Sequence, residues 1–225
     1  MQRRSAVLAT AVAALLGAAT AVASHSLAPL STLGTLVAAP APGPLGLENV
    51  PVPQVAPLAA PGKIKLGQTI SGVTCQASEK VALHIHTHLT IFVNGAARQV
   101  PYGIGIGTPL QGANDATGPF VTQGACFAWL HTHTADGIIH VESPVKRAYS
   151  LGQFFDVWGL TLSRLQVGPA HGAVTVLVDS HVWTGDLRAI PLSNKTQIQI
   201  EVGRPLVAPE KITFPEGLTP SMTAK

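Results

Sequence analysis

The segment from Val81 to Val93 alternates between two kinds of residue. Odd positions are mostly aliphatic, whereas the even positions include His84, His86 and His88. Because successive side chains of a strand point to opposite faces, this alternation predicts a β-strand with one buried face and one histidine face. The next residues, Asn94-Gly95, are a strong signal for a two-residue hairpin turn.

The rest of the chain predicts further strands and a single convincing helix. Val174–Val178 and Ile198–Val202 are β-branched runs typical of strands. Between them and the first strand, Ser150 is the expected N-cap of a short helix and Gly159 its stop. We therefore expect a mostly β (α+β) domain with one short helix. From Ile138 onward, the order strand, short strand, helix, strand, strand suggests a β-grasp-like unit.

Composition along the chain predicts four segments. Arg3 and Arg4 precede an uncharged run that ends in small residues, the pattern of a secretory signal peptide; a retained membrane anchor is the alternative. Eight of the 18 prolines follow in residues 25–62, which favours an extended spacer. We expect a signal peptide (1–23), a Pro/Ala-rich disordered linker (24–62), a His-rich β domain (63–214) and a flexible tail (215–225).

Charge limits the classes of partner. Only 11% of residues are charged, the net charge is +3, and the domain contains no run of Lys and Arg. A nucleic-acid binder would normally carry a basic stripe, so we expect no nucleic-acid partner. We also expect no membrane-spanning segment beyond the signal peptide or anchor, and a secreted or cell-envelope location. Oligomeric state stays open.

Cys75 and Cys126 are the only cysteines. In an exported protein an even number of cysteines predicts a disulfide, which here would join the segments that precede the two histidine clusters. The alternative is a pair of thiolate metal ligands, which would favour zinc or Cu(I).

A second histidine cluster consists of His131 and His133, followed by His140. If Asp136-Gly137 forms a two-residue hairpin loop, His133 lies opposite His140 and His131 lies opposite Glu142. Opposed residues share a face, so these four side chains would gather. A three-residue loop would mix the histidines with aliphatic residues, so hydrophobic segregation favours the shorter loop.

Imidazole is the commonest protein ligand for zinc and copper, and convergent histidines on strands therefore predict a site for one of these ions. Cupin-like sites use a similar set of histidines and a glutamate, although the spacing here differs and only the chemistry is comparable. The candidate ligands are His84, His86, His88, His131, His133, His140 and Glu142. A solvated polar face is the alternative for the first cluster, and the single residues His25, His171 and His181 are interpreted as structural.

Several phrases occur together: His84-Ile85-His86-Thr87-His88, a Trp-Leu-His-Thr-His phrase at 129–133, a Gly-Ile-Ile-His-Val-Glu-Ser-Pro phrase at 137–144, and the helical phrase at 151–159. Through these phrases, the segment of residues 62–218 resembles a family of exported bacterial proteins without an assigned activity. The resemblance implies that the histidines and both cysteines belong to one module, and it implies no substrate.

Three functions follow from these patterns. The first is an extracytoplasmic protein that binds zinc or copper through two strand elements. The second is a metal-dependent hydrolytic or oxidative enzyme with an open site and Glu142 as the catalytic base. The third is a cell-envelope interaction module with structural histidines. The chain lacks Gly-x-Ser-x-Gly and His-Glu-x-x-His, which disfavours the enzyme.

Overall fold

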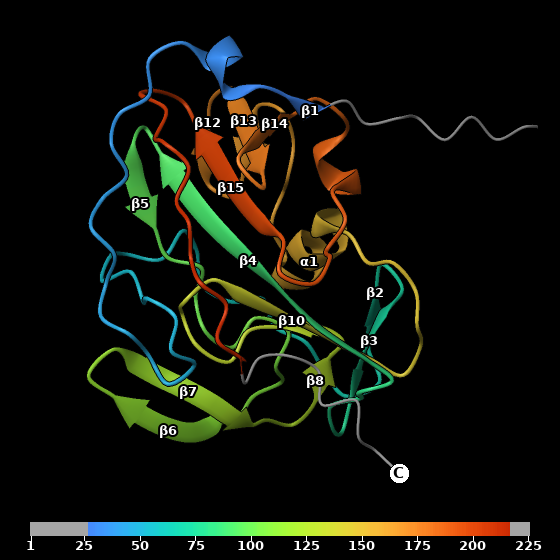
Figure 1. Cartoon of the computed structure of the whole chain (residues 1–225). Helices are drawn as coiled ribbons and strands as arrows, with labels where there is room; N and C mark the ends of the chain where they lie inside the picture. Colours follow the sequence, from blue (N-terminus) through green and yellow to red (C-terminus); the bar gives the residue numbers. More distant parts are fainter. Residues whose placement is uncertain (1–26, 217–225) are drawn as a thin grey trace, which may run out of the picture.

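A mixed β-sheet forms the centre of the protein, as the computed structural model shows for residues 27–216 (Figure 1). Its long strand β4 (Leu83–Val93) pairs in parallel with β15 (Gln197–Val202), and every other pairing in this sheet is antiparallel. The strand order is β1 (Leu27–Ala28), β14 (His181–Trp183), β13 (Val174–Val178), β15 (Gln197–Val202), β4 (Leu83–Val93), β10 (Ile138–Ser143) and β9 (Leu130–His131), with β5 (Ala96–Arg98) also paired to β4. The signal peptide predicted at residues 1–23 and the tail beyond Glu216 lie outside the described residues.

Smaller elements surround this sheet. Strands β2 (Thr69–Ile70), β3 (Val73–Gln76) and β8 (Phe127–Ala128) form one small sheet, while β6 (Gln111–Asp115) pairs with β7 (Gly118–Gln123) and β11 (Gln166–Val167) with β12 (Ala170–His171). Within residues 27–216, the helices are α1 (Leu151–Trp158) and the 3-10 turns η1 (Leu30–Leu33) and η2 (Leu187–Ala189). The protein is a single β-rich α+β domain, as predicted.

The central strands follow a β-grasp order. Strands β10, β4, β15 and β13 are neighbours in that order, and the two middle strands run parallel. Helix α1 comes between the first pair and the second pair along the chain. Because β10 pairs with β4 over six residues, the unit begins at β4. The sequence suggested a start at Ile138 instead.

The two faces of the sheet differ in character. On one face, aliphatic side chains of β4, β10 and β15 join the aromatic residues of α1 in the main hydrophobic core, including Ile91, Val141, Ile200, Phe155 and Trp158. The opposite face carries the histidines of β4 and the alternate residues Gln197, Gln199 and Glu201 of β15. Side-chain period two thus places an apolar layer beneath the sheet and a polar layer above it.

Two extended segments cover the polar face. The side chain of Gln199 donates to the carbonyl of Val207 (3.1 Å) and accepts from the backbone N–H of Glu210 (2.8 Å). Gln197 forms the same pair of bonds with the backbone of Ile212 (3.1 and 3.0 Å). The glutamines of β15 therefore hold residues 206–212 against the sheet.

The proline-rich segment covers the rest of this face, and the prediction of a disordered linker over residues 24–62 is wrong for the part that the structure describes. Val50 and Val52 are fully buried. The N–H of Val37 donates to the carbonyl of Leu206 (2.9 Å), and the carbonyl of Val37 accepts from the N–H of Ala208 (2.8 Å). The N–H of Leu58 donates to the carbonyl of Gln99 (3.0 Å). Proline removes a donor but keeps its carbonyl, so an extended proline-rich chain can still pack flat and accept hydrogen bonds.

Local signals in the sequence are confirmed at three places. Ser150 caps α1 in a capping box with Gln153, and Gly159 ends the helix at φ 80°. Asn94 and Gly95 form the two-residue turn between β4 and β5, with φ of 52° and 76°. These elements depend on nearest neighbours along the chain, which the sequence displays directly.

The predicted register of the second hairpin is wrong by two residues. His131 lies opposite His140, and the predicted partners His133 and Glu142 are not opposite these residues. Asp136 Oδ1 accepts from the N–H of Ile138 (2.9 Å), while the carbonyl of His133 accepts from Val121 of β7 (2.8 Å). This second partner draws His133 out of the hairpin. Because the shift is even, every side chain keeps its predicted face.

The predicted disulfide joins Cys75 of β3 to Cys126 before β8, so neither sulfur is a thiolate ligand. Closing a loop of this length stabilises the fold by about 4 kcal/mol in the chain-entropy model. It fixes the small β2–β3–β8 sheet, from which the chain enters β4 and β9. None of the helices in residues 27–216 is long and apolar enough to cross a membrane.

Glu201 on the polar face generates a prediction about pH. The carboxyl is 2% exposed, and burial raises its pKa to about 7, above its ordinary value of 4.5. The folded state therefore retains the proton, and stability present at low pH is lost as pH rises from 4.5 through 7. We expect Glu201→Gln to raise the free energy of unfolding at pH 8 by about 2 kcal/mol, and by much less at pH 5. Urea unfolding of both proteins at the two pH values measures this; an equal difference at both would contradict it.

Candidate metal centre

Three histidines lie side by side across three strands. His140 of β10 has His86 of β4 as its partner on one side and His131 of β9 on the other. One step along, Glu142 lies opposite His84. Long-range pairing of β4 with β10 thus unites the two histidine clusters that the sequence shows 40 or more residues apart. All five side chains lie on the polar face of the sheet.

His131 and His133 approach each other through their outer nitrogens. Nδ1–H of His131 donates to the carbonyl of Ala128 (2.8 Å), and Nδ1–H of His133 donates to the carbonyl of Val121 (2.5 Å). A carbonyl only accepts, so each Nδ1 carries the ring's proton and each neutral ring keeps a lone pair on Nε2. These two Nε2 atoms are 3.1 Å apart.

Burial keeps both rings uncharged. It lowers the pKa of His133 to about 4 and holds the pKa of His131 well below its usual range, with their mutual repulsion adding to the effect at His131. Two neutral rings therefore direct lone pairs at each other inside the protein. A cation between them would turn this repulsion into attraction.

His140 is oriented by a carboxylate that the sequence did not identify. Its Nε2–H donates to Oε1 of Glu48 (2.9 Å), and its Nδ1 lies 3.5 Å from Oε1 of Glu142. Burial lowers the pKa of His140, but the two glutamates outweigh it and raise the pKa to about 10. Burial likewise raises the pKa of Glu48, whereas His140 lowers it to about 2. The pair is an ion pair whose other ring nitrogen faces the cluster.

His84, His86 and Glu142 complete the cluster. Nε2 of His86 lies 3.1 Å from Nε2 of His84 and 3.1 Å from Nδ1 of His140. Nε2 of His84 is 3.1 Å from Oε1 of Glu142. Burial, followed by repulsion from His140 and His84, lowers the pKa of His86 to about 3. Although burial raises the pKa of Glu142, hydrogen bonds from His140 and His84 hold it well below its usual range.

The donor atoms fall into two groups whose members lie within 4.8 Å of one another. One contains His131, His133, His140 and Glu142, all buried, and the other contains His84, His86 and His140. Two nitrogens bound to a tetrahedral ion are about 3.3 Å apart, so the widest-spaced donors of each group need to approach by roughly an ångström to share an ion. The structure therefore brings together the four residues that the sequence grouped, although the pairing of strands differs.

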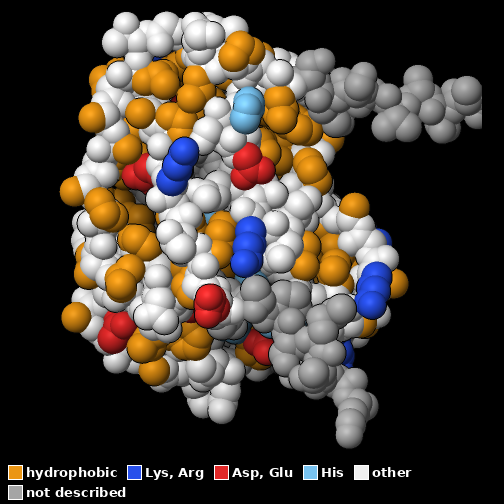
Figure 2. Space-filling view, viewed as in Figure 1, with side chains coloured by type: hydrophobic (Ala, Val, Ile, Leu, Met, Phe, Trp, Pro, Cys, Tyr) orange, Lys and Arg blue, Asp and Glu red, His pale blue; other side chains and the backbone are white. Residues whose placement is uncertain are grey.

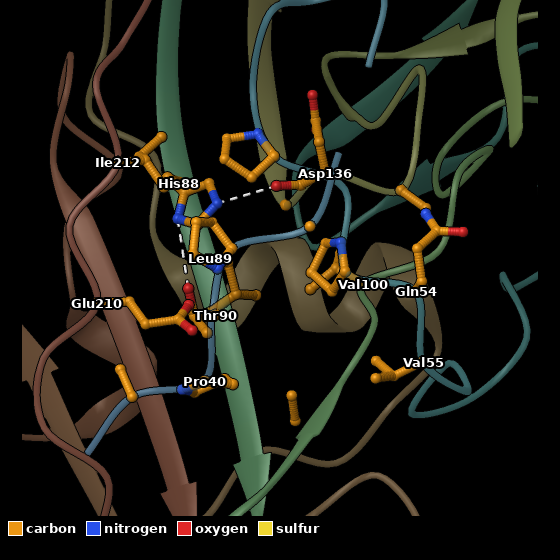
Figure 3. Close-up of a pocket in the computed structure, with 18 of the residues that line it drawn as sticks. Pro40, Gln54, Val55, His88, Leu89, Thr90, Val100, Asp136, Glu210 and Ile212 are labelled. Atoms are coloured by element: carbon orange, nitrogen blue, oxygen red, sulfur yellow. Dashed lines mark hydrogen bonds between the residues drawn. The ribbon is translucent and has the colours of Figure 1, made fainter. Parts of the chain in front are cut away.

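His88 is separate from both groups. Its Nε2–H donates to the carbonyl of Asp136 (2.9 Å), and its Nδ1 is 3.4 Å from the hydroxyl of Thr90 (Figure 3). It lines a cavity of about 520 Å³ between the sheet and the proline-rich segment, opposite Pro40 and Gln54 (Figure 3). Both ring nitrogens already have partners, so the structure gives His88 a place in a cavity wall.

The remaining histidines lie elsewhere. His171 and His181 are exposed, and His181 bonds to the carbonyl of Asp179 (2.9 Å); His25 lies outside the described residues. On the face shown in Figure 2, Lys and Arg side chains are scattered rather than gathered into a patch.

Sequence reasoning missed two glutamates. Glu48 is the only charged residue between residues 24 and 62, and this isolation was the available signal. Glu79 precedes β4, is 37% exposed, and has a carboxyl oxygen 3.5 Å from Nε2 of His133 and 3.9 Å from Nε2 of His131. Burial and the neighbouring Glu142 raise the pKa of Glu79. Five imidazoles and three carboxylates therefore surround the candidate centre.

No protein-family model matches the chain, and no curated protein or solved structure matches it either. The resemblance to exported bacterial proteins stays a prediction. The arrangement itself offers neutral nitrogen donors, an anionic oxygen donor and a carboxylate that orients one imidazole. Such a set binds borderline divalent ions and can supply a base next to them.

Proposed function

We propose that this domain binds a transition metal, zinc or copper, through His131, His133, His140 and Glu142. The observation that carries the proposal is the approach of two Nε2 lone pairs to 3.1 Å, with both Nδ1 protons committed to backbone carbonyls. Two neutral rings held in this way have no N–H that either Nε2 could donate to the other. A metal ion satisfies both lone pairs, and Glu142 offsets part of its charge.

The surroundings of His140 support the same ion class. Metal-bound histidines commonly donate their second N–H to a carboxylate, which fixes the tautomer and strengthens the ligand. Glu48 is placed in this position, at 2.9 Å from Nε2 of His140. Nδ1 is then the nitrogen that faces Glu142 and the other rings, and it would hold the ion.

The proposed place of action is outside the cytoplasm. The disulfide between Cys75 and Cys126 favours an oxidising compartment, and the uncharged run that follows Arg3 and Arg4 resembles an export signal. We propose a secreted or envelope protein that sequesters, senses or passes on metal.

A metal-dependent enzyme is a second candidate, favoured by one observation. His84 is 27% and Glu79 is 37% exposed, whereas the rest of the cluster is buried. Solvent therefore reaches one side of the centre, where a coordination position could exchange water for substrate. Glu142 would act there as a base only if it did not bind the ion.

Metal content provides the first test of the proposed function. We expect the purified protein, loaded with zinc and desalted, to lose at least one equivalent of metal in His131→Ala/His133→Ala, because the paired lone pairs are gone. Elemental analysis measures the metal-to-protein ratio. The matched control is His171→Ala/His181→Ala, which removes two exposed histidines and should keep the full metal content. Unchanged metal in the first variant would favour an interaction module with structural histidines.

Glu48 provides the second test. Glu48→Gln keeps an acceptor for His140 but removes the charge, so we expect zinc affinity to fall by about 10- to 100-fold. Competition with a chromophoric chelator gives the affinity. Glu210→Gln is the control, since it neutralises another carboxyl on the polar face that belongs to neither donor group. Equal affinity in the Glu48 variant would show that this carboxylate does not act on the ion.

Exogenous ligands distinguish the enzyme from the binding protein. An open position would let azide bind the Cu(II)-loaded protein and produce a new charge-transfer band. A site filled by protein ligands would leave the visible spectrum unchanged at the same azide concentration. The first result supports the enzyme, and the second supports sequestration or transfer.

A further inference from the structure

We propose that the cluster binds two metal ions at once, one between His131 and His133 and one between His84 and His86, with Glu142 between the ions. This inference rests on the proposed function and adds a second site to it. The observation behind it is that the donor atoms form two groups that share His140 and do not converge on one point.

The strand order separates the two histidine pairs. His84 and His86 lie on β4, His131 and His133 lie on or just beyond β9, and β10 runs between these strands. Neighbouring strands are about 4.8 Å apart, so the pairs approach the centre from opposite sides across about 10 Å. Ligands of one zinc or copper ion must lie within about 4 Å of one another. The donor atoms of the two pairs fall into separate groups and do not all lie within 4.8 Å of one another, so in this arrangement one ion does not reach both pairs.

The two pairs have the same internal geometry. The Nε2 atoms are 3.1 Å apart in each pair, and the ring centroids are 4.7 Å apart in each. Two nitrogens at about 2.0 Å from a tetrahedral ion are about 3.3 Å apart. Each His-x-His unit therefore has the geometry of a two-nitrogen chelate.

The middle strand supplies ligands between them. Oε1 of Glu142 is 3.1 Å from Nε2 of His84 and 3.5 Å from Nδ1 of His140, while Oε2 is buried without a hydrogen-bond partner. A carboxylate can give one oxygen to each of two ions. His140 has only Nδ1 available, since Glu48 holds its Nε2. Glu79 lies beside the His131–His133 pair on the exposed side of the cluster.

Charge favours a second ion. When Nδ1 of His140 binds a metal ion, that ring gives up its positive charge. Glu48, Glu79 and Glu142 can then place three negative charges around five neutral imidazoles, more than one divalent ion neutralises. Buried charges need compensation because desolvation makes each of them costly.

The competing arrangement is a single ion beside a hydrogen-bonded pair. Nε2–H of His84 can donate to Glu142, and Nδ1–H of the charged His140 can donate to Nε2 of His86, at the distances observed. In that arrangement His131 and His133 bind the ion, whereas His84 and His86 only form hydrogen bonds beside it. Metal stoichiometry separates the two arrangements.

The experiment compares the full protein with two pair variants. Each is loaded with excess zinc, desalted over a weak chelating resin and analysed for metal, with circular dichroism as the check on folding. We expect two equivalents in the unchanged protein, one in His84→Ala/His86→Ala and one in His131→Ala/His133→Ala. His171→Ala/His181→Ala should retain two and corrects for ions bound by exposed histidines. If an alanine variant does not fold, the corresponding glutamine variant replaces it, and the stoichiometry of the unchanged protein still decides.

The outcomes separate this inference from the proposed function. One equivalent in the unchanged protein, lost in His131→Ala/His133→Ala and kept in His84→Ala/His86→Ala, would overturn the second ion and leave the proposed function intact. Two equivalents retained in His84→Ala/His86→Ala would place the second ion elsewhere and also overturn the inference. No bound metal in the unchanged protein would overturn both.

Discussion

The buried polar face of the central sheet is the constraint on which the structure depends. Rings of His86, His131 and His140 and the carboxylates of Glu48 and Glu142 are almost completely removed from water. Such groups are costly to bury unless each finds a partner of opposite charge or hydrogen-bonding character. Most do so with one another. The exceptions among the described residues are Nε2 of His131 and His133 together with buried side-chain atoms of Glu48, Glu142, His86 and Asp136 that lack hydrogen bonds. Among these atoms, Nε2 of His131, Nε2 of His133 and Oε2 of Glu142 belong to residues of a single donor group.

The proline-rich segment belongs to this constraint. The apolar face of the sheet is covered by α1 and its aromatic side chains, whereas the polar face is covered by residues 37–58 and 206–212 (Figure 1). A covering helix would need an apolar stripe opposite a polar sheet, which would leave the histidines without partners. The extended segment that includes Glu48 instead supplies a charged partner, because the Glu48 carboxylate accepts from His140. The cover therefore shapes the cavity wall and also supplies the carboxylate that orients a ring.

The sequence predicted what depends on short spacings. Alternation in β4, the turn at Asn94-Gly95 and the cap at Ser150 are local, and each is confirmed. What could not be predicted depends on distant partners. The register at His131 changed because β7 binds the backbone of His133, and β4 pairs with β10 across a long connection. The side chains of His131, His133, His140 and Glu142 still lie together, because a shift of two residues preserves the face of a strand. Glu48 was missed because low charge and many prolines were interpreted as a reason for disorder.

The geometry of the His-x-His pairs links these levels. Side chains at positions i and i+2 of a strand start about 7 Å apart, yet the Nε2 atoms of both pairs are 3.1 Å apart. The rings therefore lean toward each other instead of projecting in parallel. In the His131–His133 pair, two carbonyl bonds on Nδ1 hold this inclination and also fix which nitrogen keeps its lone pair. If these histidines were only structural, turning their two lone pairs toward one point would not stabilise the fold. A ligand site gains from this arrangement, because it prepares the donors before the ion arrives.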